Sequence, residues 1–175
     1  GTSYFIGILL KSLWLVFMKL ELEGEFEVGV FLRRLNRFMA EVELDNNMIL
    51  AHLPNSGRLV TVLVPKARAF LRKESRIGRK SGYDLFAVER SGVPIIVDTR
   101  FSTIAATATI EKGQFEPLKG YSVAKQNAKV DHALIDLLLK RGKQRFFLEV
   151  KCATHVVNHV AMFPDAPTLR GRKHL

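Results

Sequence analysis

Short runs of β-branched and aromatic residues, separated at regular spacing by turn-forming residues, dominate the chain between residues 25 and 90. The candidate strands are residues 26–33, 38–44, 48–52, 59–64, 67–72 and 83–88. The sequence Asp-Asn-Asn at residues 45–47 tolerates positive φ and therefore predicts a tight hairpin. Strands of this length and spacing predict a small closed Greek-key barrel, and the pattern fits an OB-fold and an SH3-like barrel equally well.

The second half of the chain has a different pattern. After an apolar run at residues 95–97, the spacing of apolar residues predicts a short helix over residues 102–112 that ends at Gly113. Four further candidate strands follow, at residues 121–129, 133–139, 145–152 and 155–163. A helix followed by an antiparallel meander is typical of an α+β domain. We therefore expect an α+β, mostly β chain, with a barrel module over residues 19–92 and a second domain over residues 93–175.

The first 18 residues have an uncertain status. Residues 5–18 are strongly apolar, but this stretch contains Lys11 and is shorter than the roughly 20 residues that cross a bilayer. It also lacks the basic start and the cleavage site of a secretory signal. We expect no membrane partner and consider an added edge strand or docking helix, or an extension before a natural start at Met18. The single Cys152 excludes an internal disulfide and favours a reducing, cytoplasmic compartment.

Positive charge is concentrated in one segment of the predicted barrel. The chain has 27 Lys and Arg against 17 Asp and Glu, giving a net charge of +10, which attracts polyanions. Seven basic residues lie between residues 66 and 80, with Glu74 as the sole acidic one: Lys66, Arg68, Arg72, Lys73, Arg76, Arg79 and Lys80. In a mobile loop, such cations follow a phosphate backbone and release counterions. The alternative is a solvated loop without a ligand.

Two other predicted loops carry amide and guanidinium donors, which bind phosphate and sugar oxygens well. The candidate residues are Arg33, Asn36, Arg37, Asn55 and Arg58. The Pro-Asn-Ser-Gly sequence at residues 54–57 is equally typical of a turn that binds nothing. Together with the basic segment, these loops predict a nucleic-acid-binding surface.

Two carboxylates in the second half lie on adjacent predicted strands. Asp136 lies in an apolar strand, and Glu149 and Lys151 lie two residues apart in the next one, after a turn at residues 141–143. Asp136 and Glu149 could hold Mg²⁺ or Mn²⁺, while Lys151 would orient or activate water. This is the arrangement of the PD-(D/E)xK nucleases. A salt bridge between Glu149 and Lys151 or a neighbouring strand is the alternative.

Six motifs occur in order along the chain: FLRRLNRFMAEVEL, AHLPNSGRL, YDLFAVE, IDLLL, FLEVK and FPDAPTLRGRKHL. In these motifs the chain resembles the sugar fermentation stimulation protein family. The resemblance implies an N-terminal OB-fold joined to a PD-(D/E)xK nuclease-like domain, nonspecific DNA binding and a role in regulating maltose metabolism. It also supports Asp136, Glu149 and Lys151 as a catalytic site.

Departures from the family pattern weaken catalysis more than binding. The family's Ser-Arg before the strand acid is Ala133-Leu134 here, an acidic position is Asn127, and the Pro-Asn that opens the interdomain helix is Phe101-Ser102. The resemblance further implies a C-terminal truncation at Leu175. We expect a largely sequence-independent DNA-binding protein, with RNA as another possible partner, dimerisation possible and no organic cofactor. The alternative function is a Mg- or Mn-dependent nuclease.

Overall fold

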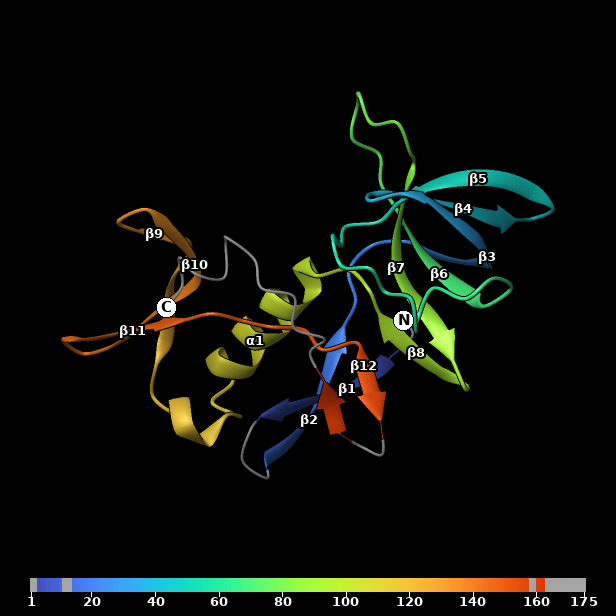
Figure 1. The fold of residues 1–175 in the computed structure, drawn as a ribbon. Coiled ribbons are helices and arrows are strands. Elements are labelled where there is room, and N and C mark those ends of the chain that lie inside the picture. The colour runs from blue at the N-terminus through green and yellow to red at the C-terminus, as the bar shows by residue number, and fades with distance from the viewer. Residues whose placement is uncertain (1–2, 11–13, 158–159, 163–175) are drawn as a thin grey trace. The chain divides into compact units, whose positions relative to one another are not determined.

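The computed structural model describes residues 3–10, 14–157 and 160–162, with side chains described from residue 20 to residue 154 (Figure 1). Residues 23–101 form the body of one compact unit, called here the barrel unit. Residues 102–152 form the body of a second, called here the helix–sheet unit. No helix within the described residues is long and apolar enough to cross a membrane.

The barrel unit is a six-stranded sheet in the order β5-β4-β3-β6-β7-β8. Its strands are β3 (Phe26–Asn36), β4 (Met39–Leu44), β5 (Asn47–His52), β6 (Arg68–Lys73), β7 (Tyr83–Arg90) and β8 (Val93–Ile96). His52 of β5 pairs in parallel with Asp84 of β7, which closes the first five strands of this order into a barrel. The closed barrel has the architecture of an OB-fold, in agreement with the sequence pattern.

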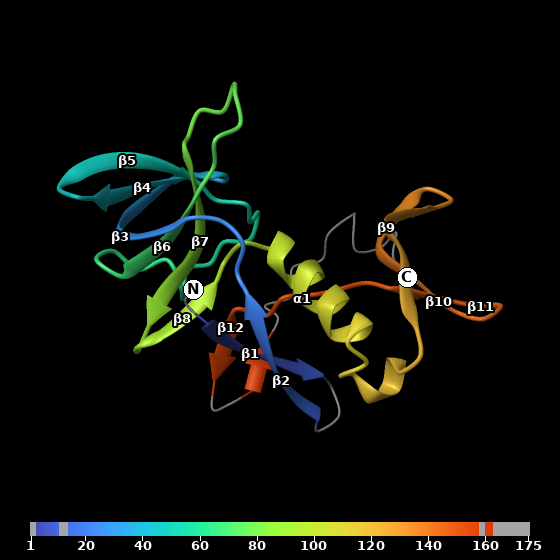
Figure 2. The same cartoon turned by 180° about the vertical axis from the view of Figure 1, so that it is seen from behind.

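Alternation along the strands fills the interior of this barrel. In β4, Ala40, Val42 and Leu44 are buried while the residues between them face outward. The predicted hairpin between β4 and β5 is confirmed, since Asp45 and Asn46 have φ values of 49° and 62°. Figure 2 shows this hairpin and the β6–β7 loop projecting from the barrel unit.

The predicted strand at residues 59–64 is wrong. Leu59 has a φ of 54°, and its carbonyl accepts hydrogen bonds from the backbone N–H groups of Val62 (3.0 Å) and Leu63 (2.9 Å), which form one helical turn. Leu59 and Val62, three residues apart, are both buried in the barrel core. The buried apolar residues here follow a helical spacing rather than the alternation of a strand.

The helix–sheet unit consists mainly of α1 (Arg100–Glu111), the 3₁₀ turn η1 (Glu116–Leu118) and a three-stranded antiparallel sheet. The sheet contains β9 (Ser122–Val130), β10 (Ala133–Arg141) and β11 (Gln144–Leu148) in the order β11-β10-β9. The predicted helix is confirmed and stops before Gly113, whose φ is 61°. The strand predicted at residues 145–152 is shorter than expected, because β11 ends at Leu148.

The sheet has one covered face. Leu137 and Leu139 of β10 are fully buried and form a core with Ile110 of α1 and Leu118 of η1. The residues that alternate with them along β10, Asp136 and Leu138, therefore face the other side of the sheet. The helix–sheet unit thus packs α1 on one sheet face and places Asp136 on the opposite face.

Two short hairpins complete the described chain. β1 (Ser3–Leu10) pairs antiparallel with β2 (Trp14–Glu21), so residues 1–18 contain strands rather than the docking helix considered above. β12 (His155–Val157) pairs antiparallel with β13 (Val160–Met162). The single strand predicted over residues 155–163 is therefore wrong where the chain is described. The motif that begins at Phe163 lies outside the described residues.

Candidate nucleic-acid interface

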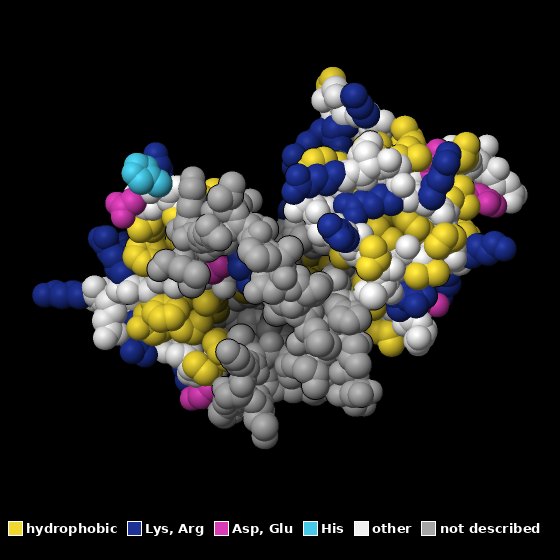
Figure 3. All heavy atoms as spheres, viewed as in Figure 1, with side chains coloured by type: hydrophobic (Ala, Val, Ile, Leu, Met, Phe, Trp, Pro, Cys, Tyr) yellow, Lys and Arg dark blue, Asp and Glu magenta, His cyan; other side chains and the backbone are white. Residues whose placement is uncertain are grey.

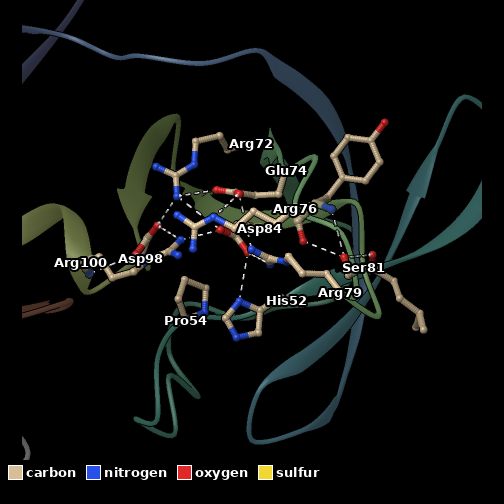
Figure 4. A network of polar contacts seen from close by, with 12 residues as sticks. His52, Pro54, Arg72, Glu74, Arg76, Arg79, Ser81, Asp84, Asp98 and Arg100 are labelled. Carbon is tan, nitrogen blue, oxygen red and sulfur yellow. Dashed lines mark hydrogen bonds and ion pairs between the residues drawn. The ribbon is translucent and has the colours of Figure 1, made fainter.

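A fully buried carboxylate, Asp84 of β7, organises the base of the β6–β7 loop (Figure 4). Its Oδ1 lies 3.0 Å from Nδ1 of His52 and accepts a hydrogen bond from Arg79. Its Oδ2 accepts from Nη2 of Arg100 at 2.5 Å and from Nη2 of Arg72 at 3.3 Å. One carboxylate thus contacts the His52 imidazole and the guanidinium groups of Arg72, Arg79 and Arg100.

Two further carboxylates extend this cluster. Asp98, also buried, accepts from Nε and Nη2 of Arg100 at 2.8 and 2.6 Å and from Nη2 of Arg72 at 3.4 Å. Glu74 lies 3.3 Å from Arg72 and 3.6 Å from Arg79. The carboxylates of Asp84, Asp98 and Glu74 therefore compensate most of the guanidinium charge at the base of the loop.

The cluster sets the ionisation of its members. Burial raises the pKa of Asp84, but the hydrogen bonds from Arg100 and Arg79 outweigh it and hold that pKa well below its ordinary range. The hydrogen bond to Asp98 raises the pKa of Arg100, which therefore stays charged. Arg72 and Arg79 were expected to contact nucleic acid, and the structure places both in this ion-pair cluster.

Arg34, which the sequence pattern did not single out, holds two barrel loops together. Its guanidinium donates five hydrogen bonds of 2.6 to 3.0 Å to backbone carbonyls. The acceptors are the carbonyls of Asn36, Arg37, Asn55, Gly57 and Arg58. All five N–H groups of this guanidinium are used, so its role is to fix the loops. Strand alternation in the sequence gives no signal for such a contact.

The two asparagines expected to bind phosphate or sugar serve their own loops. Asn55 donates from Nδ2 to the Val97 carbonyl (2.9 Å) and accepts from the Gly57 N–H at Oδ1 (2.8 Å). Asn36 accepts from the Phe38 N–H at Oδ1 (2.9 Å). Both side chains therefore stabilise turns, which favours the structural alternative for residues 54–57.

Three more of the expected cations form exposed ion pairs. Arg33 lies 2.5 Å from Glu41, and Arg68 lies 3.0 Å from Glu89. Lys73 lies 2.6 Å from Glu27, whose hydrogen bond raises the pKa of that lysine. Exposed pairs contribute little free energy and are screened by salt. Such cations can exchange a carboxylate for a phosphate at low cost.

The remaining expected cations are exposed and lack a close acidic partner among the described residues. They are Arg37, Arg58, Lys66 and Lys80, with Arg76 at 3.9 Å from Glu74 as a weak pair. Figure 3 shows Lys and Arg side chains gathered over the face of the barrel unit that carries the β6–β7 loop. Free positive charge on the barrel therefore lies on its loops, as the sequence pattern predicted.

In the helix–sheet unit, the expected acidic residues lie just beyond the last residue pair of the β10–β11 ladder. The register of β10 and β11 pairs Leu137 with Leu148, so Asp136 and Glu149 follow as the next opposed positions. The backbone N–H of Val150 donates to Oδ2 of Asp136 at 2.7 Å, and Nζ of Lys151 contacts Oε1 of Glu149. Within the described residues, no group of three or more His, Cys, Asp or Glu side chains could hold a metal.

Cations that the sequence analysis did not select lie on the same sheet face as this acidic pair. Register pairs Lys125 with Leu138, Lys129 with Leu134, and Lys140 with Arg145, and all of these positions alternate with the buried Leu137 and Leu139. Each of the four cations is exposed, and none has an acidic partner in the part of the chain that the structure describes. Strand register, which the sequence alone does not give, places them on the same sheet face as Asp136.

A closed OB-fold barrel followed by a helix and a small antiparallel sheet defines a two-part protein with basic loops. Two family descriptions match its parts: "SfsA N-terminal OB domain" over residues 32–97 and "Sugar fermentation stimulation protein RE domain" over residues 100–175. The chain belongs to the sugar fermentation stimulation protein family, which confirms the resemblance seen in the six motifs.

Known relatives cover most of the chain. A sugar fermentation stimulation protein homolog of Caldanaerobacter subterraneus is 40% identical over 84% of this chain and 64% of its own length. A homolog of Acetivibrio thermocellus is 36% identical over 89% of this chain and 67% of its own length. A solved structure, that of Pyrococcus furiosus SfsA in complex with Ca²⁺, is 32% identical with a TM-score of 0.81, covering 90% of this chain and 67% of that one. The chain thus spans about 64% of the length of the first of these relatives.

Proposed function

We propose that this chain binds DNA with little dependence on sequence, through the loop cations of the barrel unit. OB-fold barrels bind oligonucleotides across their strands and adjoining loops. Exposed guanidinium and ammonium groups contact phosphate oxygens, which carry no sequence information. The binding residues are Arg37, Arg58, Lys66, Arg76 and Lys80, with Arg33, Arg68 and Lys73 able to exchange their carboxylate partners for phosphates.

The observation that carries this proposal is the role of Arg34. Its five hydrogen bonds fix the loops that bear Arg37 and Arg58, while those two side chains stay exposed without an acidic partner among the described residues. A loop held rigid from inside loses less conformational entropy when its outer cations bind a ligand. Asp84 fixes the base of the β6–β7 loop in the same way.

This proposal is tested by measuring the affinity of the chain for several DNA duplexes of unrelated sequence. A single-stranded DNA and an RNA of equal length are measured alongside them. Fluorescence anisotropy should give similar affinities for all duplex sequences at one salt concentration. Preference for one sequence by more than about a thousandfold, the range typical of specific DNA-binding proteins, would contradict it. Within the cytoplasm, such binding would serve a regulatory role in sugar metabolism, as the family's name suggests.

A metal-dependent nuclease is the second candidate function, favoured by the geometry around Asp136. Asp136 and Glu149 supply hard oxygen donors from neighbouring positions, a set that suits Mg²⁺ or Mn²⁺. The Ca²⁺ complex of the Pyrococcus furiosus relative also supports a divalent cation. Lys125, Lys129, Lys140 and Arg145 would hold the phosphate backbone on the same sheet face.

In that function, each residue has a separate role. A bound divalent cation would neutralise phosphate charge and lower the pKa of water. Asp136 is already oriented by the Val150 N–H, and Lys151 would leave its contact with Glu149 to orient the attacking water. Asn127 lies between the residues that pair with Ile135 and Leu137, and it carries an amide rather than a carboxylate. The site has few acidic ligands, so we rank binding above cleavage.

A further inference from the structure

Ile77, at the tip of the β6–β7 loop, is fully exposed, at 104% relative accessibility. It is the most exposed of the large hydrophobic side chains in the described part of the chain. Single exposed apolar residues are common and need no explanation by themselves. The setting of Ile77 is what suggests a ligand, because the loop is basic, its base is fixed and exposed cations flank its tip.

The base of this loop is fixed by hydrogen bonds on both sides. The buried Ser81 hydroxyl lies 2.6 Å from the Leu50 carbonyl and 2.7 Å from the Tyr83 carbonyl, and it can donate its one proton to either. The Glu74 N–H donates to the Gly82 carbonyl at 2.8 Å, and Arg79 contacts both Asp84 and Glu74 (Figure 4). The chain between residues 75 and 80 is therefore held away from the barrel (Figure 1).

The tip presents one bulky apolar side chain beside a residue that has none. Gly78 has a φ of +86°, and no atom lies within 4 Å of the position that a Cβ would take. Arg76 on one side and Lys80 on the other are exposed cations. The minor groove of B-DNA is about 6 Å wide, and apolar side chains flanked by cations enter it in proteins that bend DNA.

Resting on the proposed DNA binding, we infer that Ile77 enters the minor groove of duplex DNA and inserts between two base pairs. Proteins that bend DNA use an apolar wedge of this kind, next to Arg and Lys side chains that contact the flanking phosphates. Arg76 and Lys80 supply those contacts. Arg79 does not, because Asp84 and Glu74 hold it at the base. Insertion buries Ile77 against base faces and unstacks one step of the duplex.

Duplex DNA that carries 2-aminopurine at a flexible TA step tests this inference, because the fluorescence of that base rises when it is unstacked. The full chain should raise the fluorescence on binding. Ile77→Ala should abolish the rise and weaken duplex binding roughly tenfold, since burial of an Ile side chain is worth about that factor. Ile77→Leu should retain both. Val93→Ala, at another exposed apolar position of the barrel unit, is the matched control and should behave as the unchanged chain does.

The salt dependence of binding separates this inference from the DNA binding on which it rests. Ile77→Ala should leave the slope of log affinity against log salt unchanged, because the variant keeps every cation. Salt-dependent binding without a fluorescence rise, or an Ile77→Ala variant that still unstacks the duplex, overturns the wedge and leaves the proposed binding intact. Absence of salt-dependent binding in the unchanged chain overturns both.

Discussion

Nη2 of Arg100 lies 2.5 Å from Oδ2 of Asp84, so the first residue of α1 is bound to a fully buried carboxylate of β7. The same carboxylate also contacts Arg72, Arg79 and His52. A buried charge is tolerated only when it is paired and hydrogen-bonded. The positions of the Arg72, Arg79 and Arg100 side chains therefore depend on Asp84.

Replacing Asp84 should destabilise the barrel unit strongly. Asp84→Asn leaves Arg72, Arg79 and Arg100 without their shared counter-charge, and breaking a buried ion pair typically costs about 3–5 kcal/mol. Urea denaturation should show this loss. Glu89→Gln, which breaks the exposed pair with Arg68, is the control and should cost less than about 1 kcal/mol. Equal effects of the two substitutions would contradict a structural role for the cluster.

The lowered pKa of Asp84 predicts an acid-sensitive stability. A carboxyl whose folded pKa lies below its unfolded value, about 3.9, contributes stability that is complete above that value and lost as the pH falls towards the folded pKa. The free energy of unfolding should therefore decrease as the pH falls below about 4. Asp84→Asn should show a shallower decrease over the same range. A slope unchanged by the substitution would mean that other carboxyl groups cause the acid sensitivity.

Arg34 should be required for the shape of the binding loops, and lysine should not replace it. Lysine keeps the charge but has three donors on one nitrogen and cannot span five carbonyls. Arg34→Lys should lower the unfolding free energy by about 2 kcal/mol, as expected for lost hydrogen bonds to a charged group. Amide exchange in residues 53–58 should also become faster. Unchanged exchange there would contradict the proposed loop clamp.

Most barrel strands could be predicted from the sequence, because the alternation of apolar residues and the turn residues are visible within short segments. Asp45 and Asn46 adopt the positive φ that the hairpin needs, and Val42 lies inside the barrel as alternation requires. The strand predicted at residues 59–64 is wrong because Leu59 and Val62 are buried three residues apart, as in a helical turn. The many β-branched residues of this segment favour a strand in the sequence pattern. That turn forms only because the closed barrel offers both residues an apolar interior.

The sequence could not show which candidate binding residues form ion pairs, because ion pairing depends on the fold. Arg72 and Arg79 belong to a basic segment, but the carboxylates that neutralise them, Asp84 and Asp98, come from later in the chain. The acidic pair could be proposed from the sequence alone, since Glu149 and Lys151 lie two residues apart shortly after the strand that contains Asp136. The sheet face on which Lys125 and Lys129 lie could be known only from the register of β9 and β10.

Cations without close acidic partners should contribute more to DNA binding than paired ones. Arg58→Ala removes an exposed charge with no acidic partner among the described residues, whereas Arg68→Ala removes one already paired with Glu89. We expect Arg58→Ala to reduce the salt slope by about one unit, corresponding to one phosphate contact. Arg68→Ala should change the slope less. The reverse order, measured by anisotropy, would mean that the loops are not the binding surface.

The acidic pair should account for any binding of divalent metal. Calorimetric titration with Mn²⁺ should show binding that is lost in both Asp136→Asn and Glu149→Gln, because each removes one anionic ligand. Glu116→Gln, at an exposed position of the same unit, should bind as the unchanged chain does. Any metal-dependent cleavage of DNA should disappear together with the metal. Cleavage that persists in both site variants would come from a contaminating nuclease.

The dependence of DNA affinity on salt tests the central claim most directly. Anisotropy titrations of one duplex with the full chain, between about 50 and 200 mM salt, should give a straight line of log affinity against log salt. Four to eight phosphate contacts from the barrel cations predict a slope of roughly −4 to −7, at about 0.9 per phosphate. A slope near zero, or no binding at the lowest salt, would contradict the account.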